Sequence, residues 1–102
     1  MNRIYLEFQV EQPVRQQVGS VRPRYPQALK KERVEGEVQA QFVVDTLGLI
    51  DTSTVKILTA SHPLFADAVR QVLPELQFVP AEIHGHKVKQ RVAQRFLFPP
   101  PR

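Results

Sequence analysis

A strand with two unlike faces, halted by a run of prolines, constrains this chain more than any other feature. It covers residues 88–98 and is followed at once by Pro99, Pro100 and Pro101. Read with the two-residue period of a β-strand, one face carries apolar and amide side chains, namely Val88, Gln90, Val92, Gln94, Phe96 and Phe98. The opposite face carries Lys89, Arg91, Ala93, Arg95 and Leu97. The pattern predicts a half-buried strand.

The same stretch predicts that this strand lies at the edge of its sheet. Natural sheets place Lys and Arg on exposed edges to keep other chains from pairing there, and proline has no amide hydrogen with which to extend a ladder. Our central hypothesis is that the edge stays open so that one particular peptide can pair with it. For the basic face of Lys89, Arg91 and Arg95, edge protection and attraction of a partner are equally good explanations.

Length and composition limit the kind of function. The 102 residues make one small domain without room for a large internal cavity, so we expect a surface function. A net charge of +4 favours acidic partners without selecting a class. Cysteine is absent, which excludes disulfides and thiolate metal sites. No signal peptide and no segment approaching the roughly 20 apolar residues of a membrane helix is evident, so we expect the chain as given to be soluble.

The residues before the core predict a strand, an arm and a short helix. Residues 3–10 alternate, with Ile4, Leu6, Phe8 and Val10 on one face, and predict a strand. Residues 14–24 lack periodicity and predict a connecting arm. Residues 25–33 predict a short helix, because Pro26 suits its first position.

The remaining elements follow from alternation and turn residues. Residues 37–45 give the clearest strand, Asp45 to Gly48 supply a hairpin turn, and residues 49–59 return with a bulge expected near residues 51–53. A helix is predicted from Pro63 until Pro74 ends or bends it near Leu73. A short extended piece at residues 78–81 and a turn at Gly85 precede the last strand.

This order of elements predicts an α+β fold of the β-β-α-β type. If the crossover through the helix is right-handed, the strand near residues 37–45 lies between the other two and runs antiparallel to both. The last strand is then left at an edge. We expect the helix to cover one face of this three-stranded sheet, with a short helix before the first core strand and an extra strand at the N-terminus.

No arrangement of residues indicates catalysis, so we do not expect an enzyme. The candidate nucleophiles and acids have simpler interpretations as turn, cap or helix-surface residues, and these are Ser53, Ser61, Asp45, Asp51 and Asp67. A weaker alternative is zinc or copper binding by His84 and His86, with His62 as a distant third ligand. A polar turn around Gly85 explains the same histidines.

Short motifs that follow one another through residues 21–98 resemble the C-terminal domain of TonB energy transducers. They are PRYP at residues 23–26 with Ala28, EGEV at 35–38, FVVD at 42–45 with Gly48, the helix around 65–72, FVPAE at 78–82, GHKV at 85–88 and FLF at 96–98. Each is weak alone, and the ordered series is specific. The resemblance divides the chain into an N-terminal strand and arm (1–20), the TonB-like domain (21–98) and a proline-rich tail (99–102).

The resemblance implies a periplasmic domain that captures the TonB box of an outer-membrane transporter by β-strand addition and transmits energy for import. The implied binding residues belong to the last strand and to the arm before the Tyr-Pro pair: Arg22, Pro23, Val88, Lys89, Gln90, Arg91, Val92, Ala93, Gln94, Arg95 and Phe96. No cofactor is implied. A membrane helix and a spacer that would reach an ExbB/ExbD-type motor in the inner membrane are missing, so we expect an excised domain with Met1 as an artificial start.

One departure from the family pattern is the apolar strand at residues 4–10. We expect it to pair with a sheet edge, either the binding edge of its own chain or that of a neighbour in a strand-exchanged homodimer. Two other functions stay open. A TonB-like domain of an envelope sensor or peptidase has the same fold, whereas a small basic nucleic-acid-binding domain is disfavoured because the outward positions Glu37, Gln39, Gln41 and Val43 offer no aromatic ring for stacking.

Overall fold

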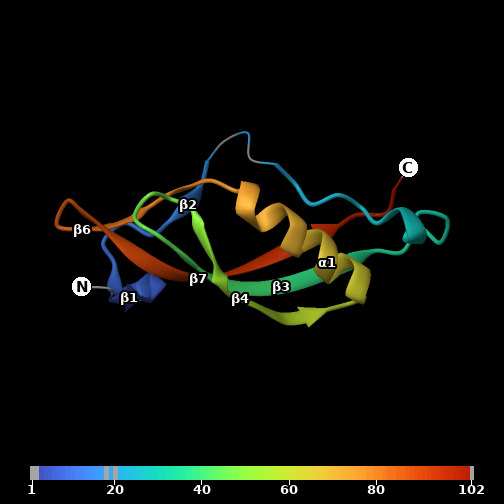
Figure 1. Ribbon diagram of the computed structural model, residues 1–102, viewed down its shortest axis with the longest axis horizontal. Coiled ribbons are helices and arrows are strands. Elements are labelled where there is room, and N and C mark those ends of the chain that lie inside the picture. Colours follow the sequence, from blue (N-terminus) through green and yellow to red (C-terminus); the bar gives the residue numbers. More distant parts are fainter. Residues whose placement is uncertain (1–2, 18, 20, 102) are drawn as a thin grey trace.

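A five-stranded sheet organises the computed structural model, which describes residues 3–17, 19 and 21–101. The main path of the sheet runs through β1 (Ile4–Tyr5), β7 (His86–Phe98), β3 (Gly36–Val44) and β4 (Ile50–Ala60), and β6 (Ala81–Ile83) pairs with the start of β7. A second, two-stranded sheet joins β2 (Arg15–Gln16) to β5 (Phe78–Val79). The domain is elongated, with extents of 50 × 24 × 20 Å, and β7 runs along its length (Figure 1).

Strand β3 is the centre of the fold. It runs antiparallel to both β4 and β7, and its pairing with β7 continues without a register shift from Gly36, opposite Phe98, to Val44, opposite Gln90. Every second side chain of β3 is fully buried, as the alternation predicts, and these are Val38, Ala40, Phe42 and Val44. The predicted α+β fold with a central strand near residues 37–45 is therefore confirmed.

Helix α1 (Pro63–Val72) covers one face of the sheet (Figure 1). It begins where the Nδ1 atom of His62 accepts a hydrogen bond from the backbone N–H of Leu64 at 3.0 Å. As predicted from Pro74, the α-helix gives way to a single 3₁₀ turn, η3 (Leu73–Glu75). No helix among the described residues has the length and the apolar character needed to cross a bilayer.

The turn between β3 and β4 requires glycine. Gly48 has φ +84°, and a Cβ atom there would lie 2.0 Å from the carbonyl oxygen of Phe78. The N–H of Phe78 donates to the Gly48 carbonyl at 2.9 Å, so the turn is fixed to β5. Strand β4 then shows two register shifts against β3, and the predicted irregularity near residues 51–53 corresponds to the larger one.

The strand predicted at residues 3–10 is wrong in extent. Only Ile4–Tyr5 pairs as a strand, and the chain then turns through the 3₁₀ helix η1 (Glu7–Gln9). The side-chain Oε1 of Gln9 accepts from the N–H of Leu6 at 2.8 Å, and the N–H of Gln9 donates to the Leu6 carbonyl at 2.9 Å. This local turn ends the strand, and the alternating apolar residues remain on the surface, with Phe8 81% exposed.

The short helix predicted at residues 25–33 is present, but its extent and type are wrong. The structure has one 3₁₀ turn, η2 (Gln27–Leu29). An isolated helix of two turns is marginal in water, and here tertiary contacts decide the conformation instead. The ring of Tyr25 packs edge-on against Phe65 at 5.5 Å between centroids, and its hydroxyl donates to the Val34 carbonyl.

The arm after β1 is fastened to the fold by main-chain hydrogen bonds. The N–H groups of Glu11 and Gln12 both donate to the Glu82 carbonyl at 3.1 Å, and β2 pairs with β5 further along. Between these points the N–H of Val14 donates to the side-chain Oε1 of Gln90 at 2.9 Å. Residues 11–17 are thus a structural part of the domain.

Candidate functional site

Part of β7 has a free edge, as the sequence predicts. On the side away from β3, β1 pairs in parallel with Lys89 and Gln90 only. Strand β6 pairs with residues 86–88. Among the described residues, no strand pairs with residues 91–98 on that side. We call this segment the open edge.

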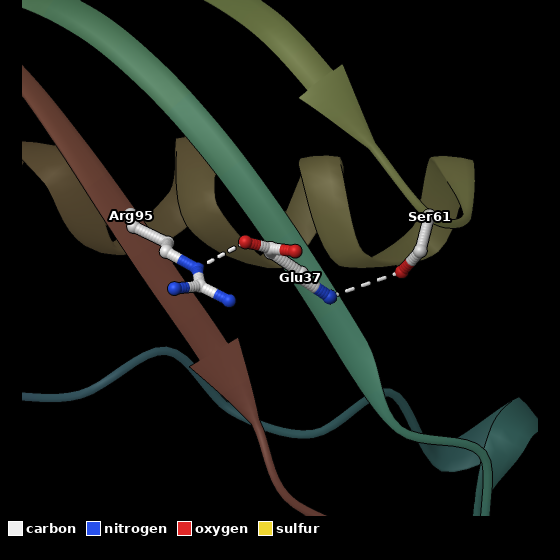
Figure 2. A network of polar contacts seen from close by, with 3 residues as sticks. All are labelled: Glu37, Ser61 and Arg95. Atoms are coloured by element: carbon white, nitrogen blue, oxygen red, sulfur yellow. Dashed lines mark hydrogen bonds and ion pairs between the residues drawn. The ribbon is translucent and has the colours of Figure 1, made fainter.

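The main-chain hydrogen bonds of Glu37 in β3 establish which way the hydrogen-bonding groups of β3 point. The pairing of β3 with β7 then gives the direction of the same groups in β7. The N–H of Glu37 donates to the Oγ atom of Ser61 at 3.0 Å (Figure 2). Its carbonyl accepts from the Ser61 N–H, also at 3.0 Å, so both groups face the β4 side. Successive residues of a strand direct these groups to opposite sides. Val38 and every second residue after it therefore direct theirs toward β7.

The β7 residues that pair with Val38 and every second residue after it must direct their own N–H and C=O groups toward β3. Phe96 lies opposite Val38 and Val92 lies opposite Phe42, so both exchange hydrogen bonds with β3. The intervening residues direct N–H and C=O away from β3, and within the open edge these are Arg91, Ala93, Arg95 and Leu97. An added strand would find donors and acceptors there at every second residue.

The side chains of these outward residues form a basic and partly apolar surface. All are exposed, and Leu97 is 63% exposed. Arg95 forms an ion pair with Glu37 across the sheet (Figure 2), which at the surface contributes about 0–1 kcal/mol. Arg91 has no ion-pair partner within the described part of the chain, so its charge remains available to an acidic ligand.

Among the hollows that described residues line beside the open edge, one lies against the arm and another against the N-terminal turn. The larger, of about 620 Å³, lies between the end of β7 and the arm, and Arg22, Pro23 and Tyr25 contribute to its wall. The smaller, of about 380 Å³, lies between residues 91–94 and the N-terminal turn at Leu6 and Glu7. The structure thus brings the predicted arm residues Arg22 and Pro23 to the same groove as β7.

The predicted residues of β7 fall into distinct groups. Val88 pairs with Ala81 of β6, and Lys89 lies opposite Ile4 of β1, so both are engaged within the chain. The side chain of Gln90 is only 2% exposed and holds the arm, which removes it from the surface.

The main-chain groups of the other predicted residues divide by direction. Those of Val92, Gln94 and Phe96 point inward, and those of Arg91, Ala93 and Arg95 point outward. Leu97 also directs its main-chain groups outward. It was not among the predicted residues, although the two-residue alternation continues past Arg95.

Two of the three histidines considered as metal ligands make other contacts. His62 caps α1. His84 lies in the β6–β7 turn, where its Nδ1 is 3.2 Å from the Oε2 of Glu11 and its N–H donates to the Oε1 of the same residue at 2.8 Å. No group of three or more His, Cys, Asp or Glu residues in the described ranges is arranged to hold a metal ion.

Comparison with known proteins agrees with this architecture. The family described as the Gram-negative bacterial TonB protein C-terminal matches residues 21–100. Among solved structures, the solution NMR structure of the Pseudomonas aeruginosa TonB C-terminal domain matches with a TM-score of 0.69 and 23% identity, covering 87% of this chain and 88% of that chain. At this identity the likeness shows a common fold. No curated protein sequence gives a significant match.

Proposed function

Because the chain belongs to the family of Gram-negative bacterial TonB C-terminal domains, which are periplasmic interaction modules, we propose that it captures the TonB box of outer-membrane transporters by β-strand addition. In this proposal the domain then transmits energy for import to the transporter that it holds. The domain would work as part of a protein anchored in the inner membrane and driven by an ExbB/ExbD-type motor.

The observation that carries the proposal is the row of outward main-chain groups on the open edge. An added strand gains main-chain hydrogen bonds at such an edge, and side chains at alternate positions give selectivity. Arg91, Ala93, Arg95 and Leu97 offer these groups in one uninterrupted register with β3 behind them. After the cost of ordering a short peptide, we expect micromolar affinity, about −8 kcal/mol.

The groove beside the edge supports the same binding mode. Arg22 and Pro23 stand across the larger hollow from β7, so a strand on the edge would lie between β7 and the arm. The anchored ring of Tyr25 fixes this part of the arm against Phe65. The two walls therefore need little rearrangement to receive a strand, which lowers the entropic cost of binding.

Backbone amide NMR during titration with transporter N-terminal peptides tests the proposal. We expect the largest shifts at the amides of Arg91, Ala93, Arg95 and Leu97. A peptide of the same sequence, N-methylated at alternate amides, is the control, because one of the two methylation patterns removes the donors that face β7. Shifts elsewhere in the domain while β7 stays silent would exclude the open edge as the binding site.

A further inference from the structure

Strand β1 occupies the same side of β7 as the open edge and stops where the open edge begins. Ile4 lies opposite Lys89 and Tyr5 lies opposite Gln90, in parallel orientation. A strand continuing in this direction would next cover Arg91. Instead the chain leaves the edge at Leu6 and enters η1.

The departure at Leu6 is fixed by hydrogen bonds on both sides. Gln9 closes the turn onto Leu6 through its side chain and its main chain, at 2.8 and 2.9 Å. Beyond the turn, Glu11 and Gln12 are bonded to the carbonyl of Glu82. The turn is therefore held in place from two directions.

This turn faces the groove. Leu6 and Glu7 line the smaller hollow together with residues 91–94 of β7. A strand lying on the open edge would meet these two residues at one end. At the other end β7 gives way to Pro99, whose missing N–H stops the ladder.

We infer that residues 3–9 act as a register stop, meaning a fixed obstacle that limits how far a bound strand can slide along β7. The inference rests on the proposed function. A slide of two residues keeps every side chain on its face and is therefore the slip that side-chain pattern alone opposes least. With Lys89 already paired to β1, such a slip toward β1 gains no main-chain partner and collides with Leu6 and Glu7.

Deletion of residues 1–9 tests the inference without removing a core residue. None of residues 3–9 is buried, and the family match begins later, at residue 21. The bonds of Glu11, Gln12 and Val14 that hold the arm remain. The probe is an isotope-labelled transporter peptide that binds in the titration above, prepared also with two extra residues at either end. NOEs between the main chains of β7 and the peptide report the register.

For the full chain we expect one register, and less than a twofold change in Kd when the peptide is lengthened toward η1. For the deletion variant we expect a second register displaced by two residues toward Lys89. The peptide lengthened at that end should bind the variant about three- to tenfold more tightly, because Lys89 adds a hydrogen-bonding residue.

Two full-length variants provide the matched comparison. Gln9→Ala loosens the turn and should admit part of the displaced register, whereas Phe8→Ala alters an exposed side chain of the same turn and should not. An unchanged single register after deletion, with no gain from the longer peptide, overturns the register stop and leaves the proposed function intact. Several registers in the full chain overturn it as well. Absence of any peptide contact with β7 rejects both proposals.

Discussion

The two edges of the main sheet are built in opposite ways. Strand β7 pairs with β3 in one unbroken register, and its outward groups follow at every second residue. Strand β4, on the other side of β3, shifts register between the pairs at Gln39 and Ala40 and again between those at Gln41 and Val43. The two strands flank β3 (Figure 1). Only β7 pairs with β3 in an unbroken register.

Under the proposed function, the difference explains how a small sheet can bind a strand at one edge and discourage pairing at the other. Bulges twist an edge and interrupt its pattern of donors and acceptors, which discourages pairing with another chain. In β4, nearby side chains accept hydrogen bonds from main-chain groups at the bulge. The Oγ1 of Thr54 accepts from the N–H of Val43 at 2.9 Å, and Asp51 accepts from both the N–H and the hydroxyl of Ser53 at 3.1 and 2.6 Å.

The largest expected effect is loss of the fold on Val92→Pro. Val92 directs its N–H toward β3, so proline removes a ladder bond in the interior of the sheet and should cost about 3 kcal/mol or more. Urea denaturation followed by circular dichroism measures this. A variant that keeps its stability and loses only peptide binding would contradict the assigned direction of the main chain.

The next largest effect compares a proline substitution in β7 with one in β4, the two strands that flank β3. Ala93→Pro removes an outward N–H from β7, and we expect peptide Kd to rise more than tenfold with the fold retained. Ala60→Pro in β4 is the matched control. Ala60 lies opposite Val38 and directs its N–H away from β3, toward the outer edge of β4. Its Kd should stay within twofold of the original by calorimetry. Equal losses would mean that β4 also contacts the peptide.

A smaller effect tests the bulge of β4 itself. Val43 is buried, and Thr54→Val leaves its N–H without the hydroxyl that accepts its hydrogen bond. We expect a loss of about 1–3 kcal/mol in the free energy of unfolding. Thr54→Ser keeps the hydroxyl and should retain most of that stability. If both variants behave alike, the methyl group of Thr54 matters more than its hydrogen bond.

The smallest effect is electrostatic. Hydrogen bonds from the Ser53 hydroxyl and N–H lower the pKa of Asp51 below 3.8. A carboxyl group whose pKa is lower in the folded state stabilises the fold at pH values above its unfolded-state pKa. This contribution is lost as the pH falls through the folded-state pKa. Asp51→Asn should therefore lower the Tm slightly at pH 7, and the difference from the unchanged chain should vanish in acid. A difference that persists below the pKa of Asp51 would point to a cause other than charge.

The sequence predicted those parts of the fold whose residues repeat with a clear period. Alternation identified β3 and β7, and spacing together with Pro63 and Pro74 identified α1 and its end. The same alternation was misleading at residues 3–10, because the hydrogen bonds of Gln9 close a turn there. The apolar pattern could not show that β1 would pair with only two residues of β7 before the chain turns away at Leu6.

The open edge of β7 was predictable from the sequence, whereas the direction of each main-chain N–H and C=O along it was not. Period alone assigns side chains to faces, whereas the direction of each N–H depends on which neighbour a strand pairs with. In this domain that direction is given by the hydrogen bond between Glu37 and Ser61. The burial of Gln90 likewise depends on the arm, since its partner Val14 is distant in sequence.

The alignment of β7 with the 50 Å long axis of the domain has a mechanical consequence (Figure 1). A ligand strand seated beside β7 and pulled along that axis would be loaded in shear, with all its main-chain bonds stretched together. Pulled crosswise, the same strand would peel away one bond at a time at far lower force. The direction of tension would then decide whether a weak complex holds or lets go.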